Sequence, residues 1–336
     1  MFRGSTILIT GGTGSWGQKL AAALLERQPA EIRIYSRGES AQVAMNRAFG
    51  GDPRLKFIIG DVRDAQAVLD ACRGVHYVFH LAALKHVPVC EFQPQETLKT
   101  NVLGTENVIR AAIDCGVRKV IDVSTDKAVD PVNVYGMTKA IGEKLTIRAN
   151  GWSPGTRFVC IRGGNVLGTS GSVVPLFLRQ IAEGKELTLT DAGMTRFFLT
   201  LTEAIGLLLK AAEASVGGET FVMRMNGCRI ADLAAVLAEA SAGDGAAGLP
   251  VRETGIRPGE KLHEVLISPY EAPSARIYDS RYFVILPPSP GEALTAAYGG
   301  LPKAGFPQYR SDDRLMNRSE IAALLRAEGF IRQARR

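Results

Sequence analysis

The chain has 336 residues, of which 46% are hydrophobic and 22% are charged, and its formal net charge is +6. These values are ordinary for a soluble globular protein and allow a large core and two domains. No dense stripe of lysine and arginine with interleaved aromatic residues is present, which argues against nucleic-acid binding. No apolar run is long enough to span a membrane, so we expect no membrane partner. The five cysteines are widely spaced and form no C-x-x-C pair, which indicates free thiols and predicts a cytoplasmic protein.

The first half of the chain alternates short apolar runs with helical patterns. Continuous apolar runs are typical of strands in a parallel sheet that is covered on both faces. The predicted strands are 6–10, 32–35, 57–60, 77–81, 120–123 and 158–161, and the predicted helices include 18–27, 94–115 and 135–148. An alternation of this kind predicts an α/β fold with a doubly wound parallel sheet.

A glycine-rich turn follows the first predicted strand. It reads T-G-G-T-G-S-W-G, with Gly11, Gly14 and Gly17 spaced as G-x-x-G-x-x-G before a helix. Glycines allow a tight turn and a close approach of the backbone to a pyrophosphate, and the helix N-terminus offers free N–H groups. The motif therefore predicts a Rossmann-type domain that binds a dinucleotide.

The ends of the next three strands suggest how that dinucleotide is held. The second strand ends in Ser36 and Arg37. An acidic residue there would hold a ribose 2′-hydroxyl, whereas serine and arginine suit a 2′-phosphate. We therefore expect NADP, with NAD as the alternative. Asp61 after the third strand is expected near the adenine, and Ala82 and Ala83 after the fourth leave room for a nicotinamide ribose.

The fourth strand and the segment after it contain further polar candidates. His80 lies within the strand and is expected to be a core histidine, whereas Lys85 and His86 follow in a loop and are better candidates for substrate contact. Asn101, in the predicted helix 94–115, is expected to tie the neighbouring strand loop to the next long helix. The alternative for Asn101 is a polar residue satisfied on its own helix.

The fifth predicted strand ends in Ser124 and Thr125, and a helix carrying Tyr135 and Lys139 follows. The end of a buried strand is a usual place for chemistry in an open α/β sheet. Tyr135 and Lys139 stand at i and i+4, on one helical face. An ammonium one turn away favours the phenolate, so we expect a lowered tyrosine pKa and a base for a sugar hydroxyl. Lys139 is also expected to hold the nicotinamide ribose.

The second half of the chain is less regular. We predict strands at 187–190 and 196–200 and helices at 171–183, 202–214 and 319–326, and the βαβ pattern ends near Phe221. Asn165 lies in a glycine-dense loop. In the mixed-charge segment 257–264, Arg257 is a candidate clamp for a diphosphate and Glu260 for a ribose diol, although such a cluster is more often a solvated face. We assign 1–168 to the NADP-binding Rossmann domain, to which about 193–216 returns, and 169–336 to a smaller substrate-binding domain and C-terminal tail.

Seven motifs together resemble the extended short-chain dehydrogenase/reductases. Within that family they are most similar to the UDP-N-acetylglucosamine 4,6-dehydratases of the soluble, C5-inverting type that opens pseudaminic acid synthesis. The motifs cover roughly residues 6–264 and read T-G-G-T-G-S-W-G, A-A-L-K-H-V-P, S-T-D-K-A-V-D-P-V-N-V-Y-G-M-T-K, G-N-V-L-G, G-S-V-V-P, T-D-A-G-M-T-R-F and R-P-G-E-K-L-H-E. Membrane-anchored, C5-retaining relatives carry methionine where this chain has Tyr135.

The resemblance implies a lyase that converts UDP-N-acetylglucosamine to UDP-2-acetamido-2,6-dideoxy-β-L-arabino-hexos-4-ulose. Tyr135 would take the C4 hydroxyl proton while hydride passes to NADP⁺, Lys127 would remove the C5 proton, and Asp126 would help C6 water leave. Hydride would then return to C6. These roles require a lowered pKa for the Lys127 ammonium and a raised carboxyl pKa for Asp126.

The resemblance also implies the residues that bind each ligand. The expected cofactor set is Gly11, Thr13, Gly14, Ser15, Trp16, Gly17, Ser36, Arg37, Asp61, Val62, Ala82, Ala83, Lys85, Asn101, Ser124, Tyr135, Lys139 and Val166. The expected substrate set is Lys85, Thr125, Asn165, Val174, Thr190, Arg196, Arg257 and Glu260. No metal is expected. A homo-oligomer, either a dimer or a hexamer, is the expected assembly.

The chain departs from the family pattern at three places. Ser40 and Ala41 follow Glu39 where a lysine is usual, Gly163 replaces a tyrosine, and the segment 169–172 lacks an arginine. A UDP-sugar 4-epimerase, or a dehydratase for another nucleotide sugar, therefore stays open as an alternative. A non-catalytic NADP-binding regulator is a third possibility, which the complete catalytic set argues against.

Overall fold

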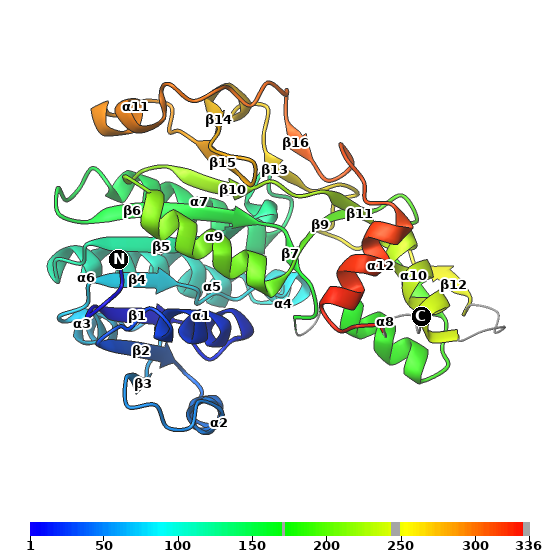
Figure 1. Cartoon of the computed structure of the whole chain (residues 1–336), viewed down its shortest axis with the longest axis horizontal. Coiled ribbons are helices and arrows are strands. Elements are labelled where there is room, and N and C mark those ends of the chain that lie inside the picture. Colours follow the sequence, from blue (N-terminus) through cyan, green and yellow to red (C-terminus); the bar gives the residue numbers. More distant parts are fainter. Residues whose placement is uncertain (170–171, 243–248, 332–336) are drawn as a thin grey trace.

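A nine-stranded sheet organises the protein (Figure 1). The computed structural model describes residues 1–169, 172–242 and 249–331. Seven strands run parallel in the order β3-β2-β1-β4-β5-β6-β10, and β15 and β14 continue the same sheet in antiparallel pairing. Their bounds are β1 Thr6–Thr10, β2 Glu31–Ser36, β3 Leu55–Ile59, β4 Tyr77–His80, β5 Lys119–Thr125, β6 Arg157–Gly163, β10 Thr220–Met223, β14 Ala275–Ile277 and β15 Tyr282–Ile285.

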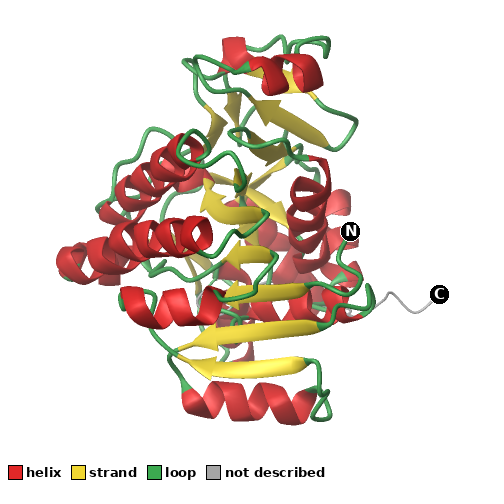
Figure 2. Cartoon of the chain, turned by 90° about the vertical axis from the view of Figure 1, so that its left-hand side faces the viewer, coloured by secondary structure: helices red, strands yellow, loops and turns green. Residues whose placement is uncertain are grey.

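Helices cover both faces of this sheet (Figure 2), which explains why most residues of its central strands are apolar and buried. One face packs against α1 (Ser15–Leu25) and α9 (Leu201–Ala214) through a core that contains Ile7, Ile9, Leu20 and Leu208. The other face packs against α3 (Ala65–Cys72), α6 (Gly104–Asp114) and α7 (Val134–Ala149). The predicted α/β fold with a doubly wound parallel sheet is confirmed.

A smaller lobe lies beside the sheet and has a core of its own. It contains α8 (Val173–Ala182), α10 (Ile230–Ala242) and α12 (Arg318–Ala327), together with the short strands β8 (Leu187–Leu189), β9 (Thr195–Leu199), β11 (Gly227–Arg229) and β12 (Val251–Glu253). Three further short strands, β7 (Asn165–Val166), β13 (Val265–Ile267) and β16 (Tyr309–Arg310), connect lobe and sheet. The division of the chain at residue 168 stays a prediction, and β10, β14 and β15 extend the large sheet past that position.

Two segments differ from the sequence-based expectation. The predicted helix 94–115 consists of α5 (Pro94–Leu98), a π-helical turn (Lys99–Leu103) and α6. The wider turn carries Asn101, whose side chain bonds to both backbone groups of Leu84 at 2.8 and 2.9 Å. The predicted loop after β5 begins with a 3₁₀ turn, Asp126–Ala128. The remaining helices are α2 (Glu39–Ala48), α4 (Val87–Phe92) and α11 (Glu292–Tyr298), and none of the helices described is long and apolar enough to cross a membrane.

A buried charge cluster fixes the C-terminal half against the sheet. Arg162 on β6 contacts Glu143 of α7 at 2.6 Å and Glu271 at 2.7 Å, and it also donates to the carbonyl of Leu266 at 3.1 Å. Arg162 and Glu143 are almost fully buried. Because buried charges must be paired, this cluster positions the segment around β13 relative to β6 and α7.

We predict that Arg162→Met lowers the free energy of unfolding by about 3–5 kcal/mol, since it leaves two carboxylates buried without their cation. Urea denaturation followed by circular dichroism measures the change. Arg110→Met is the control, because Arg110 forms an exposed i,i+4 pair with Glu106 whose loss should cost only about 0.3–0.5 kcal/mol. Equal effects of the two substitutions would contradict the prediction.

Candidate active site

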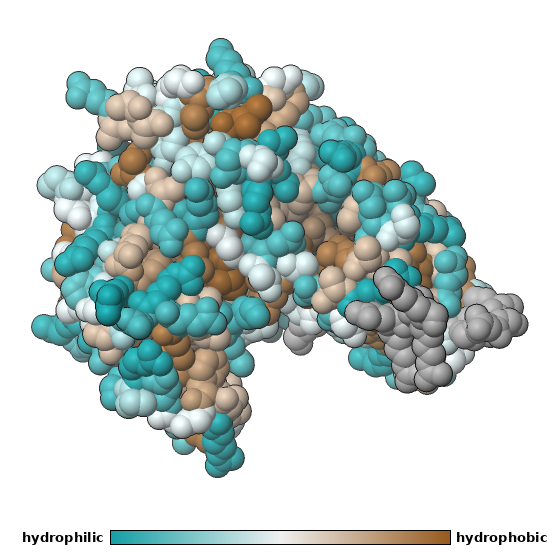
Figure 3. Space-filling model, viewed as in Figure 1, coloured by the Kyte–Doolittle hydropathy of each residue, from teal (hydrophilic) through white to brown (hydrophobic). Residues whose placement is uncertain are grey.

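One large cleft opens at the carboxyl ends of the parallel strands. Its volume is about 1010 Å³, and its wall includes residues that follow β1, β2, β3, β4, β5 and β6 on one side and residues of the smaller lobe on the other. Figure 3 shows the molecule hollowed between these two parts. Strand ends that meet at one edge of a parallel sheet form the usual ligand site of this fold class.

The turn between β1 and α1 forms a cradle at one end of the cleft. A Cβ atom on Gly11 would lie 2.9 Å from the backbone of Ala82, so the turn and the segment after β4 touch without room for a side chain. Helix α1 begins after Gly14 without a side-chain cap, which leaves its first N–H groups for a ligand. Gly17 does not line the cleft. It allows α1 to pack on the turn, because its Cβ would lie 2.3 Å from the carbonyl oxygen of Gly12.

The next part of the cleft contains the residues expected near the adenosine. Gln42 of α2 donates to Ser36 Oγ at 3.0 Å and so fixes that side chain. Asp61 bonds to Arg63 at 2.6 Å, while Arg37 lies 3.9 Å from the same carboxylate oxygen and its side chain is 58% exposed. Arg37 is therefore a cation at the cleft that its neighbours only weakly engage.

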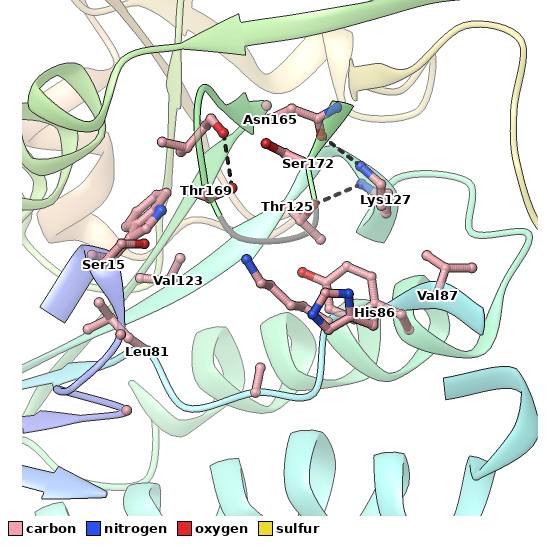
Figure 4. Close-up of a pocket in the computed structure, with 18 of the residues that line it drawn as sticks. Ser15, Leu81, His86, Val87, Val123, Thr125, Lys127, Asn165, Thr169 and Ser172 are labelled. Carbon is pink, nitrogen blue, oxygen red and sulfur yellow. Dashed lines mark hydrogen bonds between the residues drawn. The ribbon is translucent and has the colours of Figure 1, made fainter. Parts of the chain in front are cut away.

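The 3₁₀ turn after β5 brings the predicted acid and base together. Lys127 Nζ donates to Asp126 Oδ1 at 3.0 Å. It also donates to Asn165 Oδ1 at 3.1 Å (Figure 4). The hydroxyl of Thr125 also donates to Asp126 Oδ1, at 2.9 Å. On a further side, Lys127 Nζ lies 3.8 Å from Glu264 Oε1. The amine thus stands at the cleft wall inside a cage of oxygen atoms.

This cage makes Lys127 more basic, which corrects the expectation of a lowered pKa. Burial alone would lower the pKa of the Lys127 ammonium, but Asp126 and Glu264 outweigh it, and the pKa lies above its ordinary value. Arg196 opposes them only in part. In the ligand-free structure Lys127 is therefore an ammonium group and not yet a base.

Tyr135 lies at the same wall, and its pKa also differs from the expectation. Burial raises the pKa of the Tyr135 phenol above its ordinary value, and the nearby Lys139 and Lys127 offset this only in part. Lys139 is 2% exposed and does not line the cleft. Its Nζ lies 3.4 Å from both carboxylate oxygens of Asp122 on β5, because a buried ammonium needs a counter-ion. Lys139 therefore acts on Tyr135 from behind the cleft wall, and Asp122 balances much of its charge.

Most of the remaining predicted site residues line the cleft. Besides those already placed, they are Thr13, Ser15, Trp16, Val62, Ala83, Lys85, Ser124, Val166, Thr190, Arg257 and Glu260. Of the two histidines named in the sequence analysis, His86 also lines the cleft. His80 is buried between Thr10 and Thr105 and is a core histidine, as expected.

Three predicted residues besides Gly17 and Lys139 lie behind the cleft wall. Val174 is fully buried in the core of the smaller lobe, because it lies on the apolar face of α8. Asn101 is buried and holds Leu84 and Thr138. Asp126 is also buried, but its Oδ2 atom has no protein partner among the described residues. The segment 169–172, where the chain departs from the family pattern, includes Ser170 and Gly171, which lie outside the described residues.

Sequence reasoning missed three charged residues of the site. Asp122 pairs with Lys139, Glu264 contacts Lys127, and Lys261 lines the cleft nearby. Glu264 ends the motif R-P-G-E-K-L-H-E, which drew attention only to Arg257 and Glu260. Cationic side chains outnumber carboxylates along the cleft, which favours an anionic ligand. The cationic residues are Arg37, Lys85, Lys127, Arg196, Arg257 and Lys261.

A family model described as polysaccharide biosynthesis protein matches residues 7–286. The chain belongs to this family. It is 46% identical over 272 residues to a Campylobacter jejuni protein named UDP-N-acetylglucosamine 4,6-dehydratase (inverting), which covers 80% of this chain and 79% of that protein. It is 47% identical over 274 residues, with the same coverage, to a Rickettsia prowazekii protein named UDP-glucose 4-epimerase. The resemblance expected from the motifs is thereby confirmed at the level of the family.

Solved structures agree with the fold. The X-ray structure of Pen from Bacillus thuringiensis covers 99% of this chain and 100% of its own, with a TM-score of 0.91 and 35% identity. The structure of a dTDP-glucose 4,6-dehydratase from Streptomyces venezuelae, a double mutant with NAD and DAU bound, matches 76% of this chain and 86% of its own. The TM-score is 0.68 and the identity is 26%.

We predict that Lys139→Met raises the phenol pKa of Tyr135 further, because a nearby cation that stabilises the phenolate is lost. The substitution also leaves Asp122 buried without its partner, so the protein loses stability. The double variant Asp122→Asn/Lys139→Met should regain stability but keep the raised pKa. Ultraviolet difference titration against Tyr135→Phe measures the pKa, and thermal melting measures stability. A Tyr135 pKa that returns to wild type in the double variant would contradict the prediction.

Proposed function

We propose that the protein is a nucleotide-sugar 4,6-dehydratase that converts UDP-N-acetylglucosamine with inversion at C5. The main support is the contact between Lys127, which lines the cleft with Tyr135, and Asp126, which is buried directly behind it. This contact brings an acid, a base and a phenol together. The cationic cleft suits the diphosphate of a nucleotide sugar. Arg257 is the proposed ligand of that diphosphate, and Glu260 is the proposed ligand of the ribose diol. The Campylobacter relative supports the choice of sugar.

The residues at the β1–α1 turn fit a nicotinamide dinucleotide. The cradle at Gly11 and the uncapped N-terminus of α1 would hold its pyrophosphate, and Ser36 and Arg37 would hold a 2′-phosphate, which favours NADP over NAD. When bound, the cofactor supplies reversible oxidation of the sugar, so the overall reaction has no net redox change. The Streptomyces dehydratase, with NAD bound, supports this class of cofactor.

Tyr135 is the proposed base for the first step. Its phenolate would accept the proton of the C4 hydroxyl as that carbon becomes a ketone. Because burial raises the phenol pKa, Lys139 and Lys127 must stabilise the phenolate for this step to occur at neutral pH. A ketone at C4 then makes the C5 hydrogen acidic.

Asp126 and Lys127 are the proposed acid and base for the loss of water. Lys127 must first become an amine, and its nearest carboxylate is Asp126 at 3.0 Å. Transfer of one proton from Lys127 Nζ to Asp126 Oδ1 breaks an N–H bond and forms an O–H bond. That single transfer yields both an amine to remove the C5 proton and a carboxylic acid to protonate the leaving C6 hydroxyl. Adjacent residues are thus suited to act on adjacent sugar carbons.

A UDP-sugar 4-epimerase is the second candidate, because the Rickettsia relative carries that name at nearly the same identity. Epimerisation needs the phenol and the cofactor but no base at C5. Lys127 therefore separates the two proposals.

We predict that wild-type protein yields a 4-keto-6-deoxy product from UDP-N-acetylglucosamine and incorporates solvent deuterium at C5. Lys127→Met should lower that rate by about 10²–10⁴-fold, as for loss of a general base. Mass spectrometry and NMR of the product measure both effects. The proposal fails if wild-type protein returns only the C4 epimer. If the Lys127→Met variant then epimerises the sugar at the wild-type rate, the protein is an epimerase.

For the cofactor, Arg37→Ala is expected to weaken NADP binding about tenfold or more and to leave NAD binding nearly unchanged. The reason is the loss of a charge-assisted contact to the 2′-phosphate alone. Isothermal titration calorimetry with each dinucleotide measures the difference. Arg47→Ala is the control, because Arg47 is exposed on α2 and does not line the cleft. An equal loss for both dinucleotides would overturn the choice of NADP.

We also propose a cytoplasmic homo-oligomer. In support, exposed apolar side chains gather on the segment from α4 to α7, which covers one side of the sheet. They are Val89, Phe92, Leu98, Leu103, Met137 and Ile141. An apolar surface of this kind is typical of contacts between protein chains.

A further inference from the structure

Glu264 is a buried carboxylate that reaches the cleft from the C-terminal half of the chain. Its backbone is fixed on both sides, because its N–H donates to Ser311 Oγ at 2.9 Å and its carbonyl accepts from the N–H of Ser311 at 2.9 Å. The residue directly precedes β13, which Arg162 ties to the sheet through the carbonyl of Leu266. The place of the carboxylate is therefore set by residues that are distant in sequence from the turn Asp126–Ala128.

The two oxygens of this carboxylate have different surroundings. Oε1 lies 3.5 Å from Arg196 Nε and 3.8 Å from Lys127 Nζ. Oε2 is buried and has no protein partner among the described residues, although Glu264 is part of the cleft wall. A carboxylate that serves only to neutralise Arg196 would not need to contact Lys127 as well.

Charged groups from several elements face the Lys127 amine. Asp126 lies on its own turn, Arg196 on β9, and Glu264 and Lys261 on the segment before β13. Tyr135 of α7 is a further titratable neighbour. Asp126 balances one cation of this group and Glu264 a second. If Asp126 takes the proton of Lys127, as proposed above, Glu264 and Arg196 remain as a balanced pair.

We propose that Glu264 is a positioning residue for Lys127, which fixes the place of its amine and sets the pH above which that amine is a base. The chemical use of the amine rests on the proposed function, whereas the electrostatic coupling does not. Loss of the Glu264 charge removes an attraction for the ammonium and leaves Arg196 unbalanced beside it. Both changes favour the neutral amine.

Trace labelling of the purified, ligand-free protein with acetic anhydride tests the coupling. The extent of acetylation of each lysine is followed against pH by peptide mass spectrometry. We expect Glu264→Gln to move the midpoint for Lys127 about 1–3 pH units lower, the range for loss of one close opposite charge. Lys85 is an internal control, since it lines the cleft and only burial shifts its pKa.

Glu271→Gln is the matched control variant. Glu271 follows β13 as Glu264 precedes it, and it too pairs with a buried arginine, but its partner is Arg162 and it does not contact Lys127. Its substitution should leave the Lys127 midpoint unchanged. Glu264→Asp keeps the charge on a shorter side chain, so the midpoint should stay near wild type while kcat for the sugar falls.

The proposal is overturned if Glu264→Gln leaves the Lys127 midpoint at the wild-type value in a protein whose circular dichroism is native. It is also overturned if Glu271→Gln or Glu264→Asp produces the same shift as Glu264→Gln. Should Glu264→Gln not fold, Glu264→Ala takes its place: a Lys127 midpoint below wild type supports the proposal, and a midpoint at the wild-type value overturns it. Wild-type protein that is inactive on every nucleotide sugar would refute the proposed function but would not alter these labelling results.

Discussion

The ammonium group of Lys127 is held between two carboxylates that are far apart in the sequence. Asp126 is its neighbour in the chain, whereas Glu264 arrives more than a hundred residues later, on a segment that Arg162 fixes to the sheet. A charge this deeply placed is stable only when it is paired. The catalytic turn therefore depends on the folded C-terminal half, and the site is complete only when both parts of the chain have assembled.

The same physical rule governs Tyr135. Burial raises the pKa of its phenol, Lys139 partly offsets this, and the charge of Lys139 is balanced by Asp122. In the ligand-free protein the two base candidates, Tyr135 and Lys127, thus rest in their protonated forms, because burial favours the neutral phenol and two carboxylates face the ammonium group. A bound substrate changes this balance when it brings a diphosphate to the cationic cleft and expels water from it. Protonation of Tyr135 and Lys127 before binding is consistent with a site that becomes reactive only when it is filled.

Local sequence patterns predicted the parts of the site that a single turn specifies. The glycines before α1 and the residues at the ends of β2 and β5 lie where expected, because backbone requirements and strand ends are encoded by near neighbours. Glu264 and Asp122 were missed because their partners are distant in sequence, and nothing local marks a carboxylate as a counter-ion. The prediction that Val174 binds substrate is wrong for a different reason. Its motif placed it correctly on α8, but it lies on the face of that helix that packs into the core.

Overall similarity does not decide between dehydration and epimerisation, because relatives named for each reaction are 46% and 47% identical to this chain. The cradle, the phenol and the cationic cleft serve either reaction. The difference lies in whether a base can reach C5, which an epimerase does not need. An epimerase would have no use for a buried acid in contact with a caged amine at the cleft wall, since desolvating such a pair costs free energy. The presence of Asp126, Lys127 and Glu264 at this site therefore favours dehydration.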